Sequence, residues 1–171
     1  SDIGGWSRTA VIWLGLAAVV VCILGRCWCT LFIGGRKSAQ LVDIGPYSMC
    51  RNPLYFFSFL GAFGFGAQIG SLTVALAATL LVVLVFIATV RKEEAFLTGA
   101  LGEPYLGYLA KTPRFIPNPA LWRTVEVIEV RPRLVTMTFV DGLLFLLGVP
   151  LALGAAWLHA AGVLPVLISL P

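Results

Sequence analysis

The charged residues of the chain stand at the ends of long apolar runs. Seventeen uncharged residues separate Arg8 from Arg26, and the apolar character resumes from Cys27 to Ile33. A run of this length matches the hydrocarbon core of a bilayer, and a single arginine near its end can extend its side chain to the interface. We therefore expect one membrane helix in this region.

A second apolar run is twice as long. Between Arg51 and Arg91 lie 39 uncharged residues, which as a helix would measure about 58 Å, or two crossings of a 30 Å hydrocarbon core. The run predicts a helical hairpin whose turn falls near 68–71, the one mid-run cluster of polar and small residues. Gly66 and Gly70, four residues apart, are typical of close packing between membrane helices.

The C-terminal part predicts one further crossing. From Leu134 to the end of the chain the only ionisable residues are Asp141 and His159. Pro150 and Pro165 interrupt this apolar pattern, so we expect the crossing at about 136–158. The chain shows no internal repeat. The predicted fold is an all-α, polytopic membrane protein with about four crossings, forming one domain over residues 1–171.

Composition and charge agree with a membrane protein. Hydrophobic residues make up 59% of the chain and charged residues only 12%, which excludes an ordinary soluble domain, a disordered tail and a disulfide-stapled secreted domain. Eleven of the twelve basic residues lie in segments 26–52 and 91–133. With four crossings these segments share one side of the membrane, which the positive-inside rule makes cytoplasmic. Topology and membrane lipids thus account for the basic excess without a nucleic-acid partner.

Metal binding and several common catalytic sites find no support in the sequence. The four cysteines include no C-x-x-C pair, and there is a single histidine, so we expect no metal site. No G-x-S-x-G, H-E-x-x-H or Walker sequence is present.

Polar chemistry is concentrated in two short stretches, of which the first is 41–55. Gly45-Pro46 predicts a turn, and Asn52-Pro53 keeps Asn52 out of helical geometry while Pro53 begins the next helix. The resulting helix N-terminus faces the cytoplasm, flanked by Tyr and Arg side chains, and can receive a carboxylate or phosphate. An interfacial anchor of Tyr and Arg at headgroup level is the alternative.

The second stretch is Arg91-Lys92-Glu93-Glu94. Adjacent carboxylates at a membrane boundary suggest a cationic ligand, although a solvated helix end is the alternative. The predicted hairpin brings Asn52 and Glu93 to the same end of two neighbouring helices. Such a site offers positive and negative partners together, which suits S-adenosyl-L-methionine, a zwitterion with an additional cation.

These stretches resemble a known family. The motifs, in order, are Gly45-Pro46-Tyr47, Arg51-Asn52-Pro53-Leu54-Tyr55, Glu93-Glu94, Gly102-x-x-Tyr105-x-x-Tyr108 and Pro113-Arg114-Phe115-Ile116-Pro117. Together they resemble the isoprenylcysteine carboxyl methyltransferase and phospholipid methyltransferase family. The resemblance covers about 41–117, whereas the C-terminal extension from about 120 to 171 is not covered.

The resemblance implies a helical membrane enzyme that binds S-adenosyl-L-methionine at its cytoplasmic face and methylates a lipid-like, amphiphilic acceptor that enters from the bilayer. Carried over position by position, it implies a cofactor site formed by Gln40, Leu41, Val42, Tyr47, Asn52, Pro53, Tyr55 and Glu93. Many relatives have histidine where this chain has Asn52, and an amide cannot titrate near neutral pH. Many relatives also carry a further membrane helix upstream, which we expect to be missing from this sequence.

The expected reaction is in-line transfer of a sulfonium methyl group to a nucleophile, with orientation and exclusion of water as the main contributions of the protein. For an amine nucleophile Glu94 is the nearest candidate base, and Arg51 or Arg114 could hold an anionic acceptor group. Two other functions stay open: an NADPH-dependent sterol-type reductase, and a non-catalytic membrane subunit with a docking surface in the C-terminal segment. The paired glutamates disfavour the reductase, because a cofactor phosphate prefers basic side chains. The oligomeric state is left open.

Overall fold

The computed structural model describes residues 3–34 and 40–162 as a set of helices, and these residues contain no strand. In chain order the elements are α1 (Ile3–Ile33), α2 (Pro46–Met49), α3 (Pro53–Ala67), α4 (Leu72–Leu101), α5 (Glu103–Lys111), the 3-10 turn η1 (Pro119–Leu121), α6 (Pro132–Leu143), the 3-10 turn η2 (Leu144–Leu147) and α7 (Gly148–Ala160). The all-α prediction is confirmed.

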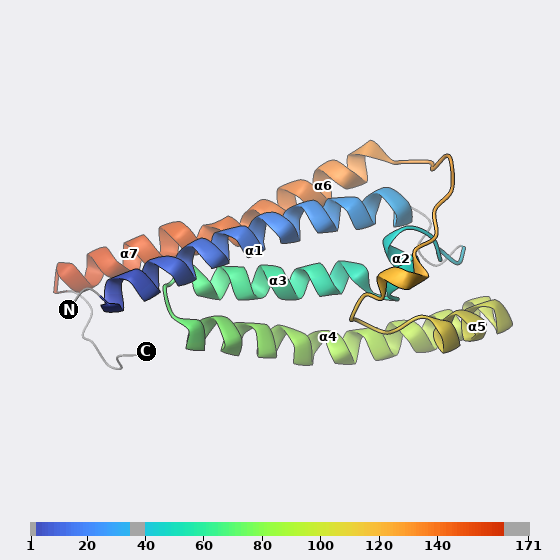
Figure 1. The fold of residues 1–171 in the computed structure, drawn as a ribbon, viewed down its shortest axis with the longest axis horizontal. Helices are drawn as coiled ribbons and strands as arrows, with labels where there is room; N and C mark the ends of the chain where they lie inside the picture. The colour runs from blue at the N-terminus through green and yellow to red at the C-terminus, as the bar shows by residue number, and fades with distance from the viewer. Residues whose placement is uncertain (1–2, 35–39, 163–171) are drawn as a thin grey trace.

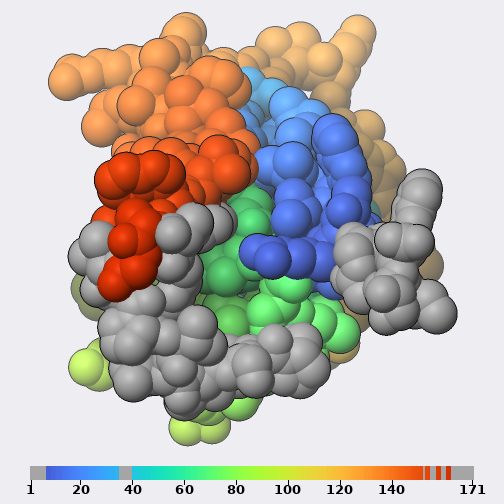
Figure 2. All heavy atoms as spheres, turned by 90° about the vertical axis from the view of Figure 1, so that its left-hand side faces the viewer, coloured from blue at the N-terminus to red at the C-terminus, as the bar shows by residue number. Residues whose placement is uncertain are grey.

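The long helices lie side by side (Figure 1). α3 lies between α1 and α4, while α6, η2 and α7 form one nearly continuous rod along α1. The short elements α2, α5 and η1 gather at one end of this bundle, which we call the α2–α5 end. Viewed from the opposite end, α6 and α7 occupy one flank beside α1, and the hairpin lies below them (Figure 2).

Three helical stretches are long and apolar enough to cross a membrane: Ser7–Ile33, Leu72–Leu101 and Pro132–Leu151. The first hairpin helix, α3, is apolar but has only 15 residues. The chain is therefore an integral membrane protein with three helices of spanning length among the described residues. The count of four crossings stays a prediction that depends on how α3 sits in the bilayer.

The hairpin turn occurs where the polar cluster predicts it. α3 ends at Ala67 and α4 begins at Leu72, capped by the Ser71 side chain, which accepts a hydrogen bond from the Val74 backbone N–H. The glycine prediction is half right. A Cβ on Gly66 would lie 2.7 Å from the Ala75 Cα, so Gly66 does allow close helix packing. Gly70 instead belongs to the turn, with a φ of 84° that favours glycine.

Close approach of α1 and α3 holds the bundle together. A Cβ on Gly64 would lie 2.6 Å from the Gly15 carbonyl oxygen, and one on Gly15 would lie 2.7 Å from the Ala67 Cβ. Small residues at such contacts bring two membrane helices into backbone contact. This contact fixes α3, and with it the residues that precede α3, relative to α1.

The C-terminal helical rod begins earlier than expected, at Pro132. Proline is tolerated at this first helical position because its missing N–H would have no partner there. Pro150 likewise falls in the first turn of α7, where it does not break the helix. A hydroxyl contact of 3.0 Å between Thr30 and Thr138 joins α6 to α1. Pro165, the other expected interruption, lies outside the described residues.

Candidate functional site

Two proline-led turns shape the α2–α5 end. Gly45 has a φ of 59°, and Pro46 then begins α2, a single helical turn. Asn52 is non-helical, with φ −127° and ψ 55°, and Pro53 begins α3, as the Asn-Pro pair predicts. The backbone N–H groups of the first turn of α3 consequently open onto this end of the bundle.

A distant segment, 113–123, pairs with these turns through its backbone. The Arg51 N–H donates to the Pro113 carbonyl at 2.8 Å, and the Asn52 N–H donates to the Arg114 carbonyl at 3.2 Å. Farther along, the Asn118 N–H donates to the Met49 carbonyl. The segment thereby holds the start of α3 in place, and we call it the clasp.

The Asn52 side chain contributes to the clasp. Its Nδ2 donates to the Arg114 carbonyl oxygen at 3.2 Å. This contact requires a neutral donor and no titration, so an amide can serve there as well as a histidine N–H group.

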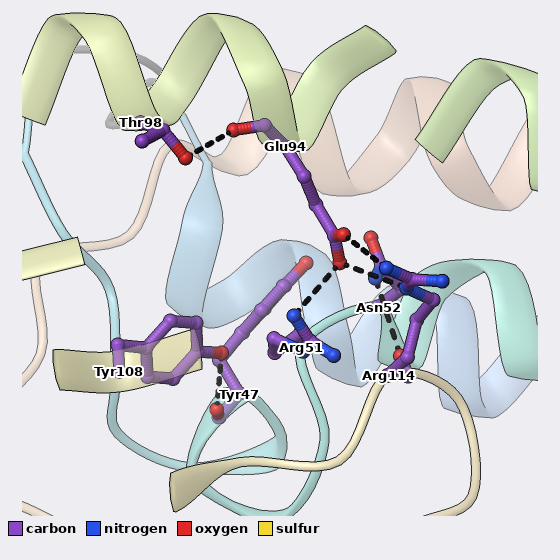
Figure 3. Close-up of polar contacts among 7 residues, drawn as sticks. All are labelled: Tyr47, Arg51, Asn52, Glu94, Thr98, Tyr108 and Arg114. Carbon is purple, nitrogen blue, oxygen red and sulfur yellow. Dashed lines mark hydrogen bonds and ion pairs between the residues drawn. The ribbon is translucent and has the colours of Figure 1, made fainter. Parts of the chain in front are cut away.

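Buried tyrosines connect α5 to α2. The Tyr108 hydroxyl donates to the Tyr47 carbonyl oxygen at 2.7 Å (Figure 3). Burial raises the pKa of both phenols well above the ordinary value, and burial raises the pKa of Tyr105 to about 12. All three phenols are therefore neutral at physiological pH. They can donate hydrogen bonds, and their rings form apolar walls.

Glu94 lies between two arginines (Figure 3). Its carboxylate lies 3.2 Å from the Arg51 Nη1 and 2.8 Å from the Arg114 Nη2, and it also accepts a bond from the Arg114 Nε at 3.3 Å. Glu94 is 8% exposed, and the Arg114 side chain is 41% exposed. Both carboxylate oxygens are thus engaged, and the ion pairs tie α4 to the start of α3 and to the clasp.

Glu93 points to a different partner. Its Oε2 accepts a hydrogen bond from the Tyr55 hydroxyl at 3.1 Å, which links α4 to the first turn of α3. Glu93 also lines a cavity that lies between these helices, the segment 40–47 and α5.

The cavity collects most of the residues predicted for the cofactor site. Seven of the eight line it: Gln40, Leu41, Val42, Tyr47, Asn52, Tyr55 and Glu93. Pro53 is fully buried but is not among the lining residues. Of the three predicted catalytic residues, Arg51 and Glu94 line the cavity, whereas Arg114 reaches it only through its ion pair with Glu94.

Sequence reasoning missed part of the wall. The additional lining residues are Ile33, Leu54, Leu97, Leu101, Tyr105 and Tyr108. Leu97 and Leu101 follow Glu93 at intervals of four residues on α4, so helical periodicity could have placed them on the same face. Tyr105 and Tyr108 belong to the sequence motifs given above, but the sequence assigned them no role.

The cavity therefore has a polar end and an apolar wall. At the polar end the Glu93 carboxylate and the open helix start of α3 offer opposite charges, because the first N–H groups of a helix carry partial positive charge. Aliphatic side chains and neutral tyrosines form the wall. Among the described residues, no group of three or more His, Cys, Asp or Glu side chains is placed to hold a metal ion.

Comparison with known proteins supports the resemblance noted in the motifs. The model of the family described as "Phospholipid methyltransferase" matches residues 9–103. The nickel-cobalt-cadmium resistance protein NccN of Alcaligenes xylosoxydans xylosoxydans is 36% identical over 94% of this chain and 78% of its own length. The cobalt-zinc-cadmium resistance protein CzcN of Cupriavidus metallidurans is 36% identical over 98% of this chain and 77% of its own length. No solved structure matches. With more than half of its residues matched by the family model, the chain belongs to the phospholipid methyltransferase family.

Proposed function

We propose that the chain is an integral membrane methyltransferase that uses S-adenosyl-L-methionine and acts on a lipid-like acceptor, with its cofactor site facing the cytoplasm. One observation carries this proposal: the cavity joins the Glu93 carboxylate to the open N-terminus of α3 beside an apolar wall. The family membership supports the methyl-transfer chemistry.

The residues present fit the proposed cofactor. Glu93 suits its ammonium group, and the backbone N–H groups of Leu54 and Tyr55 suit its carboxylate. Leu41, Val42 and Leu97 offer an apolar surface for the adenine ring. The NADPH-dependent reductase fits less well, because the carboxylates of Glu93 and Glu94 stand where a phosphate would need basic side chains.

When bound, the cofactor supplies an electrophilic methyl group on a sulfonium. The residues of this chain orient the reactants and exclude water from them, which the buried wall favours. Glu94 is already ion-paired with Arg51 and Arg114, and this favours a positioning role over the base role predicted from sequence. Arg114 is also paired with Glu94 and is partly exposed, so contact of this residue with an anionic acceptor group stays a prediction from the sequence.

A lipid-like acceptor is supported by the surface around the site. Large apolar side chains of α4, such as Leu80, Leu81 and Leu84, are more than half exposed, as expected for a helix in contact with lipid. An amphiphile can therefore reach the cavity along the bilayer, while the cofactor enters from water. In this membrane setting, the bilayer concentrates and orients the acceptor.

The relatives named as metal resistance proteins suggest a physiological setting. A methyltransferase would affect metal tolerance through the product that it makes. We therefore propose that the methylated membrane amphiphile supports tolerance of nickel, cobalt or cadmium. Growth of a deletion strain on these metals, complemented with wild type or with the Glu93→Gln variant, tests this setting. Full complementation by Glu93→Gln, once its affinity for the cofactor has been measured as weakened, would contradict it.

Glu93→Gln is the sharpest test of the cofactor site. The change removes the charge but preserves size, and a hydrogen bond to a charged group is worth about 1.5–3 kcal/mol, so we expect a roughly ten- to hundredfold weaker affinity for S-adenosyl-L-methionine. Isothermal titration of the purified proteins measures it, with Glu103→Gln, at an exposed position on α5, as the control. Tight binding of NADPH instead would support the reductase, and binding of neither would support a non-catalytic subunit.

A further inference from the structure

A second cavity opens on the side of the bundle, farther from the α2–α5 end, and holds two opposite charges. It is lined by Arg26 of α1, Ala62 and Phe65 of α3, Ala78 and Val82 of α4, and Asp141, Leu144 and Phe145 of the C-terminal rod. Its volume of about 420 Å³ is within the range of small-molecule sites. Apart from Arg26 and Asp141, its wall is apolar.

Arg26 is directed at α3. Its Nη1 donates to the Ser58 hydroxyl, and Ser58 in turn donates to the Leu54 carbonyl oxygen at 2.9 Å. The Nε of Arg26 is buried and has no hydrogen-bond partner among the described residues. No ion pair joins Arg26 to Asp141 in this part of the chain. A guanidinium inside a membrane helix is costly without an anion, and such residues mark ligand sites.

The two cavities lie along one face of α3. We call the cavity around Glu93, which we propose to bind the cofactor, the cofactor cavity. Leu54 lines it and is followed at helical spacing by Ser58, Ala62 and Phe65. Ser58 lies four residues from Leu54, or about 6 Å along the helix axis. Along α1, Arg26 lies seven residues from Ile33, which also lines the cofactor cavity, or about 10 Å.

We propose that this second cavity is an intramembrane site for an acidic amphiphile. The Arg26 guanidinium, which Ser58 positions, holds a phosphate ester or carboxylate, and the apolar wall holds the chain. This inference rests on the proposed function, because it assumes that the amphiphile in this cavity is the methyl acceptor. The nucleophile of such an acceptor would then lie about one helical turn nearer the cofactor than its acidic group. Asp141 also lines this cavity, so its formal charge balances that of Arg26.

Binding without turnover tests the site independently of methylation. Protein in a neutral maltoside detergent is titrated with radiolabelled lysophosphatidic acid and, in parallel, with a monoacylglycerol and a fatty acid of the same chain length. We expect both acidic amphiphiles to bind roughly ten- to a hundredfold more tightly than the neutral one. Equal affinities in the wild type would overturn the proposal without any variant.

Variants test whether Arg26 causes the preference for acidic amphiphiles over the neutral one. Arg26→Gln should abolish the preference, Ser58→Ala should reduce it, and Arg133→Gln, at an exposed position of α6, should preserve it. Glu93→Gln should leave amphiphile binding intact while weakening S-adenosyl-L-methionine binding, which separates failure of this proposal from failure of the proposed function.

Two further outcomes decide between a lipid site and simpler accounts. Inorganic phosphate at millimolar concentration should not displace lysophosphatidic acid, and displacement would overturn the proposal in favour of a water-facing anion site. Asp141→Asn should preserve or strengthen binding. If it instead abolished binding together with stability, as loss of an ion-pair partner of Arg26 would, the proposal would also fail.

Discussion

Neighbouring carboxylates on α4 have different surroundings. Glu93 contacts the Tyr55 hydroxyl and faces the cofactor cavity, whereas Glu94 is buried between Arg51 and Arg114. Two residues that are adjacent in a sequence motif therefore have different roles: Glu93 faces the cavity, and Glu94 holds the surrounding segments together.

Glu94→Gln should destabilise the protein. The change leaves the nearly buried Arg51 without its counter-ion, and a hydrogen bond to a charged group is worth about 1.5–3 kcal/mol. We expect the free energy of unfolding to fall by about this amount in mixed-micelle denaturation followed by circular dichroism. Glu126→Gln, at an exposed position, is the control, and equal stability of the two variants would contradict the assigned role.

Cys50 should resist alkylation. Its side chain is fully buried, and burial raises the pKa of the thiol to about 12, so no reactive thiolate forms near neutral pH. Mass-spectrometric labelling with iodoacetamide at pH 8 should leave it unmodified, while a cysteine introduced at exposed Thr124 reacts. Because the folded state retains this proton, its contribution to stability is present below about pH 9 and is lost as the pH rises toward 12. Rapid labelling of native protein at pH 8 would refute this environment.

At the scale of elements, the helices were predictable and the clasp was not. The uncharged runs and the 68–71 cluster predict α1 and the hairpin, because bilayer thickness restricts the length of membrane helices. The clasp depends on backbone hydrogen bonds between residues about 60 positions apart, such as Asn52 and Arg114, and backbone pairing has no side-chain signature. The tyrosine walls and the Arg26–Ser58 contact escaped prediction for a similar reason, since each depends on which helix faces meet.

The close α1–α3 contact predicts that replacing Gly64 destabilises the protein. Gly64→Ala places a Cβ 2.6 Å from the Gly15 carbonyl, so the helices must separate, at a cost of about 1–3 kcal/mol. Gly99→Ala is the matched control, because a Cβ there meets nothing within 4 Å and alanine favours a helix by about 0.5–1 kcal/mol. Thermal unfolding in detergent should rank Gly64→Ala below wild type and Gly99→Ala at or above it. A reversed order would exclude this packing.

At the scale of the whole molecule, the polar segments gather at one end of the bundle. The clasp, α5 and the cofactor cavity all lie at the α2–α5 end, and the hairpin turn lies at the other (Figure 1). The basic residues concentrate in the same segments, so the positive-inside rule predicts that this end lies in the cytoplasm.

Cysteine accessibility tests this orientation. On a background without the four native cysteines, cysteines at exposed Ala100 and Thr124 should react with an impermeant maleimide only from the cytoplasmic side. A cysteine at exposed Thr73, beside the hairpin turn, should react only from the other side. Permeabilised cells provide the control for total reactivity. Labelling of Ala100 and Thr124 from opposite sides would disprove the topology.

The shortness of α3 has a consequence for how water-soluble and lipid-soluble reactants meet. Its 15 residues extend about 22 Å, whereas the hydrocarbon core measures about 30 Å. If the hairpin turn lies at the far interface, as the predicted topology has it, α3 ends well before the near interface, and its open N-terminus lies at the bottom of a recess below the membrane surface. In the proposed reaction, a polar cofactor enters this recess from the water, and the acceptor is methylated without leaving the membrane.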